Sequence, residues 1–148
     1  MTSTARHEAV AVFWPHRRTL LVIEVLVAAA AVEGALQLML DAATPPDADL
    51  PGWLDSWVLP GVWLLVSVGV PSTVAAVLLH RRSHHAPPAV LLAAAALAVE
   101  LLVQIPFLGL SGLQAVLGAV VVVVTLLALD ARRRGWGESE ADPHRAGG

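Results

Sequence analysis

Apolar residues are gathered into four long blocks, and polar residues are concentrated in the segments between them. The blocks cover residues 19–40, 58–79, 89–110 and 113–129. A helix needs about 20 mostly apolar residues to cross the roughly 30 Å hydrocarbon core of a bilayer, so the first three blocks are long enough and the fourth is marginal. The pattern predicts an all-α integral membrane protein with four spanning helices.

The composition supports this fold class. Hydrophobic residues occupy 57% of the 148 positions and charged residues 14%, whereas a soluble domain is nearer half apolar and a quarter charged. Residues 1–134 are therefore expected to form a single membrane domain, and the polar segment 135–148 a disordered cytoplasmic tail. The chain has no cysteine, which excludes disulfides and thiolate metal sites.

Arginine is distributed unevenly between the connections. Arginines precede the first block, separate the second from the third and directly follow the fourth, whereas the connection between the first two blocks has aspartates and no basic residue. Cytoplasmic segments collect basic residues, so both termini are expected in the cytoplasm, and short connections predict an up-down-up-down four-helix bundle. All nine basic residues are Arg, which with the richness in Ala and Val favours a bacterial cytoplasmic (inner) membrane.

Prolines mark irregular points in this pattern. Gly69 and Pro71 interrupt the second block, so a kink is expected near its middle. Pro87 and Pro88 are expected to break any helix before the third block. Pro106 is expected to end that block.

Two Glu-x-x-x-Gln pairs lie inside the apolar blocks, one in the first and one in the third. A rise of 1.5 Å per residue puts both glutamates about 20 Å from the cytoplasmic start of their helices, in the outer half of the bilayer. An i to i+4 step keeps each glutamine on the face of its glutamate. With a further glutamine near the outer end of the fourth block, the pattern predicts one polar ligand or proton site made by Glu33, Gln37, Glu100, Gln104 and Gln114.

Intramembrane carboxyls favour a function because each costs about 2.5 to 3.5 kcal/mol on insertion scales. The leading interpretation is a site that binds a small amphipathic or cationic ligand, or that couples transport to protons. The alternative is a non-catalytic accessory subunit or assembly factor in which the polar pairs hydrogen-bond helices together. A third, an intramembrane isomerase, requires the two carboxyls to be close. The expected partners are the lipid bilayer and a second copy or another membrane protein.

A third acidic residue, Glu24, is interpreted differently. It precedes Glu33 by nine residues, which is half a turn of rotation, so the two cannot both face the bundle axis. Glu24 is expected near the cytoplasmic interface, where its side chain extends towards Arg17.

Histidines are concentrated in the connection between the second and third blocks. Imidazoles four residues apart, such as His80 and His84, can share a metal, but His85 and its neighbours include no Asp, Glu or Cys to complete a site. The segment is interpreted as a basic connector that faces anionic lipid. No phosphate-binding loop, nucleophile motif or zinc-protease motif occurs, so no catalytic residue, metal, cofactor or nucleic-acid partner is predicted.

Two stretches carry a family resemblance: "DLPGWLDSWVLPGVWLLVSVG", with Pro60, Gly61 and Gly69, and "VQIPFLGLSGLQAVLG", with Gln104 and Gln114. In these stretches the chain resembles a group of small, uncharacterised four-span membrane proteins of actinomycete-type bacteria. The resemblance implies the four-span architecture and no mechanism.

Overall fold

The chain folds into helices only, in the part that a computed structural model describes, namely residues 16–42, 44, 52, 54–108 and 112–133. The elements are α1 (Arg17–Met39), α2 (Val58–Leu64), the π-helix η2 (Leu65–Gly69), α3 (Val70–His80), α4 (Ala86–Leu108) and α5 (Gly112–Arg133). α2, η2 and α3 run on without a break and form the second span. The described ranges contain four helices long and apolar enough to cross a membrane, which confirms the four predicted spans. The predicted tail, 135–148, lies outside them.

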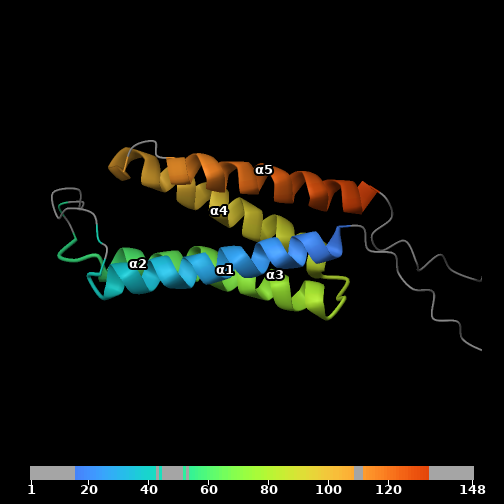
Figure 1. The fold of residues 1–148 in the computed structure, drawn as a ribbon, viewed down its shortest axis with the longest axis horizontal. Coiled ribbons are helices and arrows are strands. Elements are labelled where there is room, and N and C mark those ends of the chain that lie inside the picture. The colour runs from blue at the N-terminus through green and yellow to red at the C-terminus, as the bar shows by residue number, and fades with distance from the viewer. Residues whose placement is uncertain (1–15, 43, 45–51, 53, 109–111, 134–148) are drawn as a thin grey trace, which may run out of the picture.

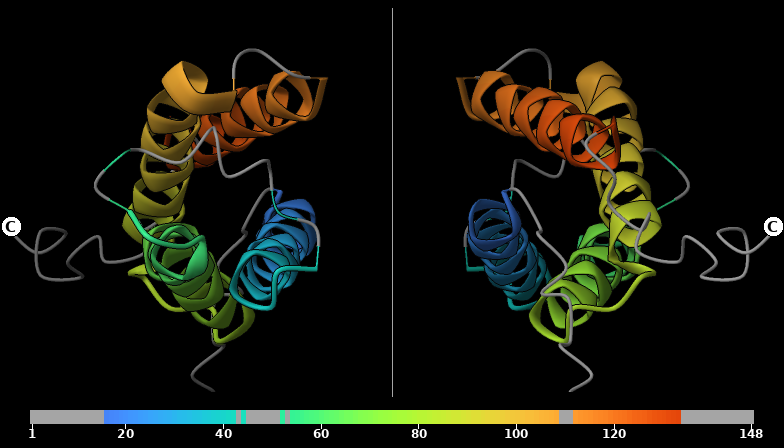
Figure 2. Two further views of the ribbon diagram at one scale, coloured as in Figure 1. Left: turned by 90° about the vertical axis from the view of Figure 1, so that its left-hand side faces the viewer. Right: turned by 90° about the vertical axis from the view of Figure 1, so that its right-hand side faces the viewer.

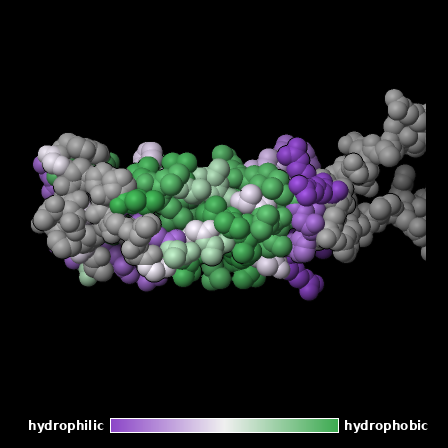
Figure 3. Space-filling view, turned by 90° about the horizontal axis from the view of Figure 1, so that it is seen from above, coloured by the Kyte–Doolittle hydropathy of each residue, from purple (hydrophilic) through white to green (hydrophobic). Residues whose placement is uncertain are grey.

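The ends of the spanning helices lie at the two ends of the long axis (Figure 1). One end, here called the arginine end, has the start of α1, the α3–α4 turn and the end of α5, and carries Arg17, Arg18, Arg81, Arg82, Arg132 and Arg133. The opposite end, the aspartate end, has the end of α1 and the start of α2, with Asp41 and Asp55. On the face that Figure 3 shows, a mostly apolar surface adjoins a hydrophilic band at the arginine end. Such an apolar surface fits the hydrocarbon core of a bilayer.

Two helix boundaries differ from the predicted blocks by three residues or more, the start of α4 and the end of α5. α4 also continues past Pro106 to Leu108, so the prediction that Pro106 ends it is wrong. α4 begins at Ala86, and Pro87 and Pro88 lie in its first turn, directly after the non-helical connection. The first N–H groups of a helix have no helical acceptor, and the fixed φ of proline suits that position. α5 continues beyond residue 129 with Arg132 and Arg133 in its last turn, where cations interact favourably with the helix dipole.

The predicted interruption of the second span takes the form of a π-helical turn, Leu65–Gly69. Pro71 follows it and has no N–H to donate to the carbonyl of Ser67, with which its ring would also clash in a regular α-helix. A wider i to i+5 turn relieves this conflict. Thr73 Oγ1 donates to the Gly69 carbonyl at 2.7 Å and so satisfies one acceptor in the altered turn.

The second span is the centre of the helix packing. It packs on α1 and on α4, while α5 packs mainly on α4 and touches α1 less (Figure 2). One core cluster lies near the arginine end and consists mainly of small residues with a few larger ones: Leu20, Ala75, Leu79, Ala86, Val90, Ala93, Ala94, Val124, Ala128 and Ala131. A second cluster, nearer the aspartate end, contains Ala31, Val68, Leu97 and Leu101. Small side chains allow the close helix contacts that stabilise bundles in lipid.

Gly61 sets the distance between α1 and α2. A Cβ at this position would lie 2.9 Å from the carbonyl oxygen of Ala35 and 3.0 Å from the Met39 side chain. The first of these atoms belongs to the backbone and cannot rotate away. α1 therefore turns the face that carries Ala31 and Ala35 towards the second span, and this orientation fixes where its acidic residues point.

Candidate functional site

Glu100 is the centre of a hydrogen-bonded cluster between the second span and α4. Its side chain is only 7% exposed. Trp63 Nε1 donates to Oε2 at 2.9 Å, and Ser67 Oγ donates to the same oxygen at 3.1 Å. Gln104 Nε2 donates to Oε1 at 3.1 Å. We call these four residues the Glu100 cluster.

The local structure explains why these donors meet one carboxyl. Trp63 and Ser67 are four residues apart on α2 and η2, so they share the face that packs on α4, and Gln104 is one turn beyond Glu100 on α4 itself. All three side-chain groups donate, and a carboxylate is an acceptor at both oxygens. The cluster thus satisfies a carboxylate in an apolar region, and it connects two spans. In membrane proteins such side-chain bonds contribute about 0.6 kcal/mol each on average.

Glu33 has the opposite environment. Its side chain is exposed, and its hydrogen-bond partner among the described residues is Gln37, whose Nε2 donates to Oε1 at 3.2 Å. The buried positions of α1 are Leu20, Glu24, Ala31 and Ala35. At about 100° per residue, Glu33 points away from that buried face. It lies on the outer surface of the bundle.

The five residues predicted to form one site are therefore not brought together. Glu100 is buried and Gln104 half-buried in the Glu100 cluster, whereas Glu33 is exposed on α1 with the half-buried Gln37 beside it. Gln114 is half-buried in the first turn of α5. The prediction treated equal depth as proximity, but depth along an axis does not fix rotation about it.

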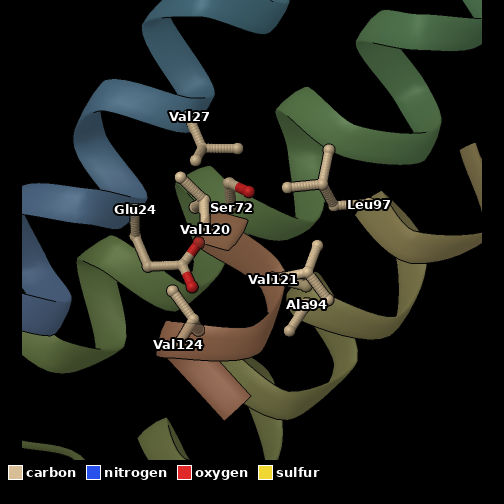
Figure 4. Close-up of a pocket in the computed structure, with 9 residues that line it drawn as sticks. Glu24, Val27, Ser72, Ala94, Leu97, Val120, Val121 and Val124 are labelled. Carbon is tan, nitrogen blue, oxygen red and sulfur yellow. The ribbon is translucent and has the colours of Figure 1, made fainter. Parts of the chain in front are cut away.

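Glu24 is the acidic residue of α1 that faces inwards. It is 2% exposed and lines a small cavity with Ser72, which is fully buried (Figure 4). Arg17, its expected partner, instead donates from Nη1 to the carbonyls of Leu79 and His80, at 2.9 and 3.2 Å. The half-turn of rotation between Glu24 and Glu33 is present as predicted, but the residue assigned to the interior was the wrong one.

Sequence reasoning missed Ser67, which donates to Glu100, and Ser72, which lines the cavity with Glu24. Both are hydroxyl residues inside the second apolar block, on either side of the Gly69 and Pro71 interruption. A hydroxyl within a span prefers a polar neighbour on another helix, so the two serines could have been predicted to lie near the intramembrane carboxyls.

The described histidines lie at the arginine end of the bundle. His16 Nε2 lies 3.0 Å from Asp130 Oδ2 and connects the start of α1 to α5. The ring centroids of His84 and His85 lie 3.7 Å apart on the exposed α3–α4 turn, with the ring planes tilted by 45°. Among the described residues there is no group of three or more His, Asp or Glu that could hold a metal ion.

No protein-family model, curated protein or solved structure matches this chain. The geometry of the intramembrane polar residues is thus the basis for assigning a function.

Proposed function

We propose that the protein is a non-catalytic four-span component of the bacterial cytoplasmic membrane that associates laterally, through the outer face of α1, with a second copy of itself. In this proposal the bundle is up-down-up-down with both termini in the cytoplasm. The Glu100 cluster holds the bundle together, and Glu33 with Gln37 forms the contact with the second copy.

The observation that carries the proposal is the exposure of Glu33 within an apolar span. Glu33 lies six residues before the end of α1 at Met39, which is about 9 Å along the helix axis. A carboxyl at the lipid surface costs about 2.5 to 3.5 kcal/mol near the centre of a bilayer and less near its edge. A second helix that supplies hydrogen-bond donors removes part of that penalty.

A second copy fits this surface because the Glu33–Gln37 pair is self-complementary. The Gln37 amide has two N–H groups and donates to Glu33 Oε1 of its own chain, which leaves an N–H group and Glu33 Oε2 for other bonds. Two copies related by a twofold axis can exchange these bonds. Ala29, one turn before Glu33, is exposed and small, so a second helix can approach closely.

Ligand binding or proton-coupled transport at Glu33 and Glu100 has less support. It requires a cavity that both carboxyls reach, whereas Glu33 lies on the exposed face of α1 and Glu100 is buried between the second span and α4. Because Glu33 is exposed and Glu100 is buried, their positions favour a role in helix packing and in contact with a second copy.

The membrane orientation can be tested with single cysteines because the natural chain has none. Ser83→Cys in the α3–α4 turn is expected to resist a membrane-impermeant maleimide in intact cells, whereas Thr44→Cys at the aspartate end is expected to react. The reverse pattern would place the arginine end outside and contradict the proposed orientation.

The lateral contact can be tested by cross-linking Ala29→Cys in native membranes. A cross-linked dimer is expected with the parent residues at positions 33 and 37, and it should fall several-fold in the combined Glu33→Leu and Gln37→Leu background. Val122→Cys, on the exposed face of α5, is the matched control and should cross-link weakly in both backgrounds. Equal cross-linking with and without the polar pair, or a product that contains a different protein, would overturn the second copy as the occupant.

A further inference from the structure

Besides the Glu100 cluster, the apolar interior of the bundle contains a second polar region, which lies where all four spans meet. Its cavity is lined by Glu24 and Val27 of α1 and Ser72 of α3, and otherwise by apolar residues of α4 and α5: Ala93, Ala94, Leu97, Val120, Val121 and Val124. Figure 4 shows the Glu24 carboxyl directed towards the α5 valines, with Ser72 on the neighbouring helix. Neither the proposed lateral contact nor the Glu100 cluster uses these residues.

Both polar side chains are removed from solvent. Glu24 is 2% exposed and Ser72 is fully buried. The Ser72 side chain is a neighbour of the Glu24 carboxyl, yet its Oγ has no hydrogen bond of standard geometry to any described residue. A buried hydroxyl without a partner is unusual and points to a further group between or beside the two side chains.

Among the described residues that line the cavity, none is a counter-ion for Glu24. The lining residues that face it from α3, α4 and α5 are serine, alanine, leucine and valine, and none of them carries a charge or titrates. Arg17, on its own helix, is held by the carbonyls of Leu79 and His80. A carboxyl without a cationic partner in an apolar core is stable when it binds a proton.

The size of the cavity limits what else can bind. The volume open to the centre of a water molecule is about 10 Å³, which is room for about one water. Glu24 and Ser72 together offer three side-chain oxygens, whereas divalent cations such as calcium take six or more oxygen ligands. A proton and one bridging water fit both the volume of the cavity and the three side-chain oxygens that line it.

We propose that Glu24 and Ser72 form a reversible proton-binding site in the core of the bundle, with one water between them. On protonation, a proton from bulk water forms an O–H bond to a Glu24 carboxylate oxygen, and no other bond changes. In the acid form this O–H donates to the water or to Ser72 Oγ; in the ionised form Ser72 O–H and the water donate to the carboxylate. A hydroxyl suits both states because it can donate and accept.

Infrared difference spectroscopy of the full chain in liposomes tests the proposal, with a change of pH as the only probe. A C=O stretching band of a protonated carboxylic acid should appear on acidification and vanish at alkaline pH. One component of this band should be missing in Glu24→Gln, in which the other carboxyls still titrate, and present in Asp55→Asn, which removes an exposed carboxyl at the aspartate end.

A second pair of variants keeps the test decisive if Glu24→Gln does not fold. Ser72→Ala retains the carboxyl and removes its hydroxyl neighbour, so the C=O band should move to higher frequency. Thr125→Val removes a hydroxyl from α5 outside the cavity lining and should leave the band in place. A C=O difference spectrum that is the same in the parent and in Glu24→Gln, or a Glu24 component that Ser72→Ala does not move, would overturn the proposal.

Discussion

The two Glu-x-x-x-Gln pairs have the same residues at the same spacing, yet they lie in opposite environments. In both, the glutamine donates to Oε1 of the glutamate one turn earlier, at 3.2 Å in α1 and 3.1 Å in α4. Glu100 also accepts two bonds from the second span, whereas Glu33 points out of the bundle. The local motif fixes the bond within the helix, and the neighbouring helices decide whether the carboxyl holds the fold together or remains available to a partner.

The largest effect is expected from Glu100→Leu. This change removes three acceptor interactions and leaves the donors of Trp63, Ser67 and Gln104 without partners, so the free energy of unfolding should fall by about 2 kcal/mol. Glu33→Leu is the matched change in the other pair and should leave the stability of the monomer within about 0.5 kcal/mol. SDS-induced unfolding of the detergent-solubilised monomer measures both. Equal losses in the two variants would contradict the contrast between the pairs.

A smaller effect is expected from Gly61→Ala, which tests how α1 is rotated. The added methyl meets the Ala35 carbonyl on the face opposite Glu33, and overpacking of this kind should lower the free energy of unfolding by about 1 kcal/mol or more. Gly118→Ala, where a Cβ meets no atom within 4 Å, is the control and should have no destabilising effect. If both glycines tolerate alanine equally, α1 does not pack on α2 through this face.

Trp63→Phe removes a single donor from the Glu100 cluster while it keeps an aromatic ring. The expected loss is about 0.6 kcal/mol of unfolding free energy. A double-mutant cycle with Glu100→Leu, measured by the same unfolding assay, should give a coupling energy of similar size. A coupling energy near zero would mean that the 2.9 Å bond does not contribute to stability.

The smallest difference is expected between the two glutamines. Gln104→Leu breaks a partly buried bond and should lower the unfolding free energy by about 0.5 kcal/mol, whereas Gln37→Leu breaks an exposed one and should change it by less than about 0.2 kcal/mol. The paired unfolding curves of the two variants test this order. A reversed order would show that the outer pair, rather than the inner one, stabilises the monomer.

The four spans could be predicted because length and apolarity are sufficient to identify a membrane helix. The rotation of α1 could not be predicted in the same way, since apolar residues surround this helix on all sides and lipid is as apolar as the bundle interior. The small residues Ala31 and Ala35 were a better guide to its inner face than the acidic ones. They pack near Gly69 and Gly61.

The candidate site was less predictable than the fold. Glu100 and Gln104 were identified as neighbours from their spacing, but the partners Trp63 and Ser67 come from another span and depend on its π-helical turn. Glu24 was assigned to the arginine end on the assumption that a charge near a cation pairs with it. Arg17 is occupied by two backbone carbonyls, so this assumption fails.

The π-helical turn in the second span also sets the rotation about the helix axis between two polar sites. Ser67 lies within this turn and faces Glu100, and Ser72 lies beyond it and faces the Glu24 cavity. The deletion of one residue here would restore a regular α-helix and rotate everything on the far side by about 100°. Only one of the two serines would then still face its carboxyl. The length of this five-residue segment therefore determines whether Ser67 can face Glu100 while Ser72 faces Glu24.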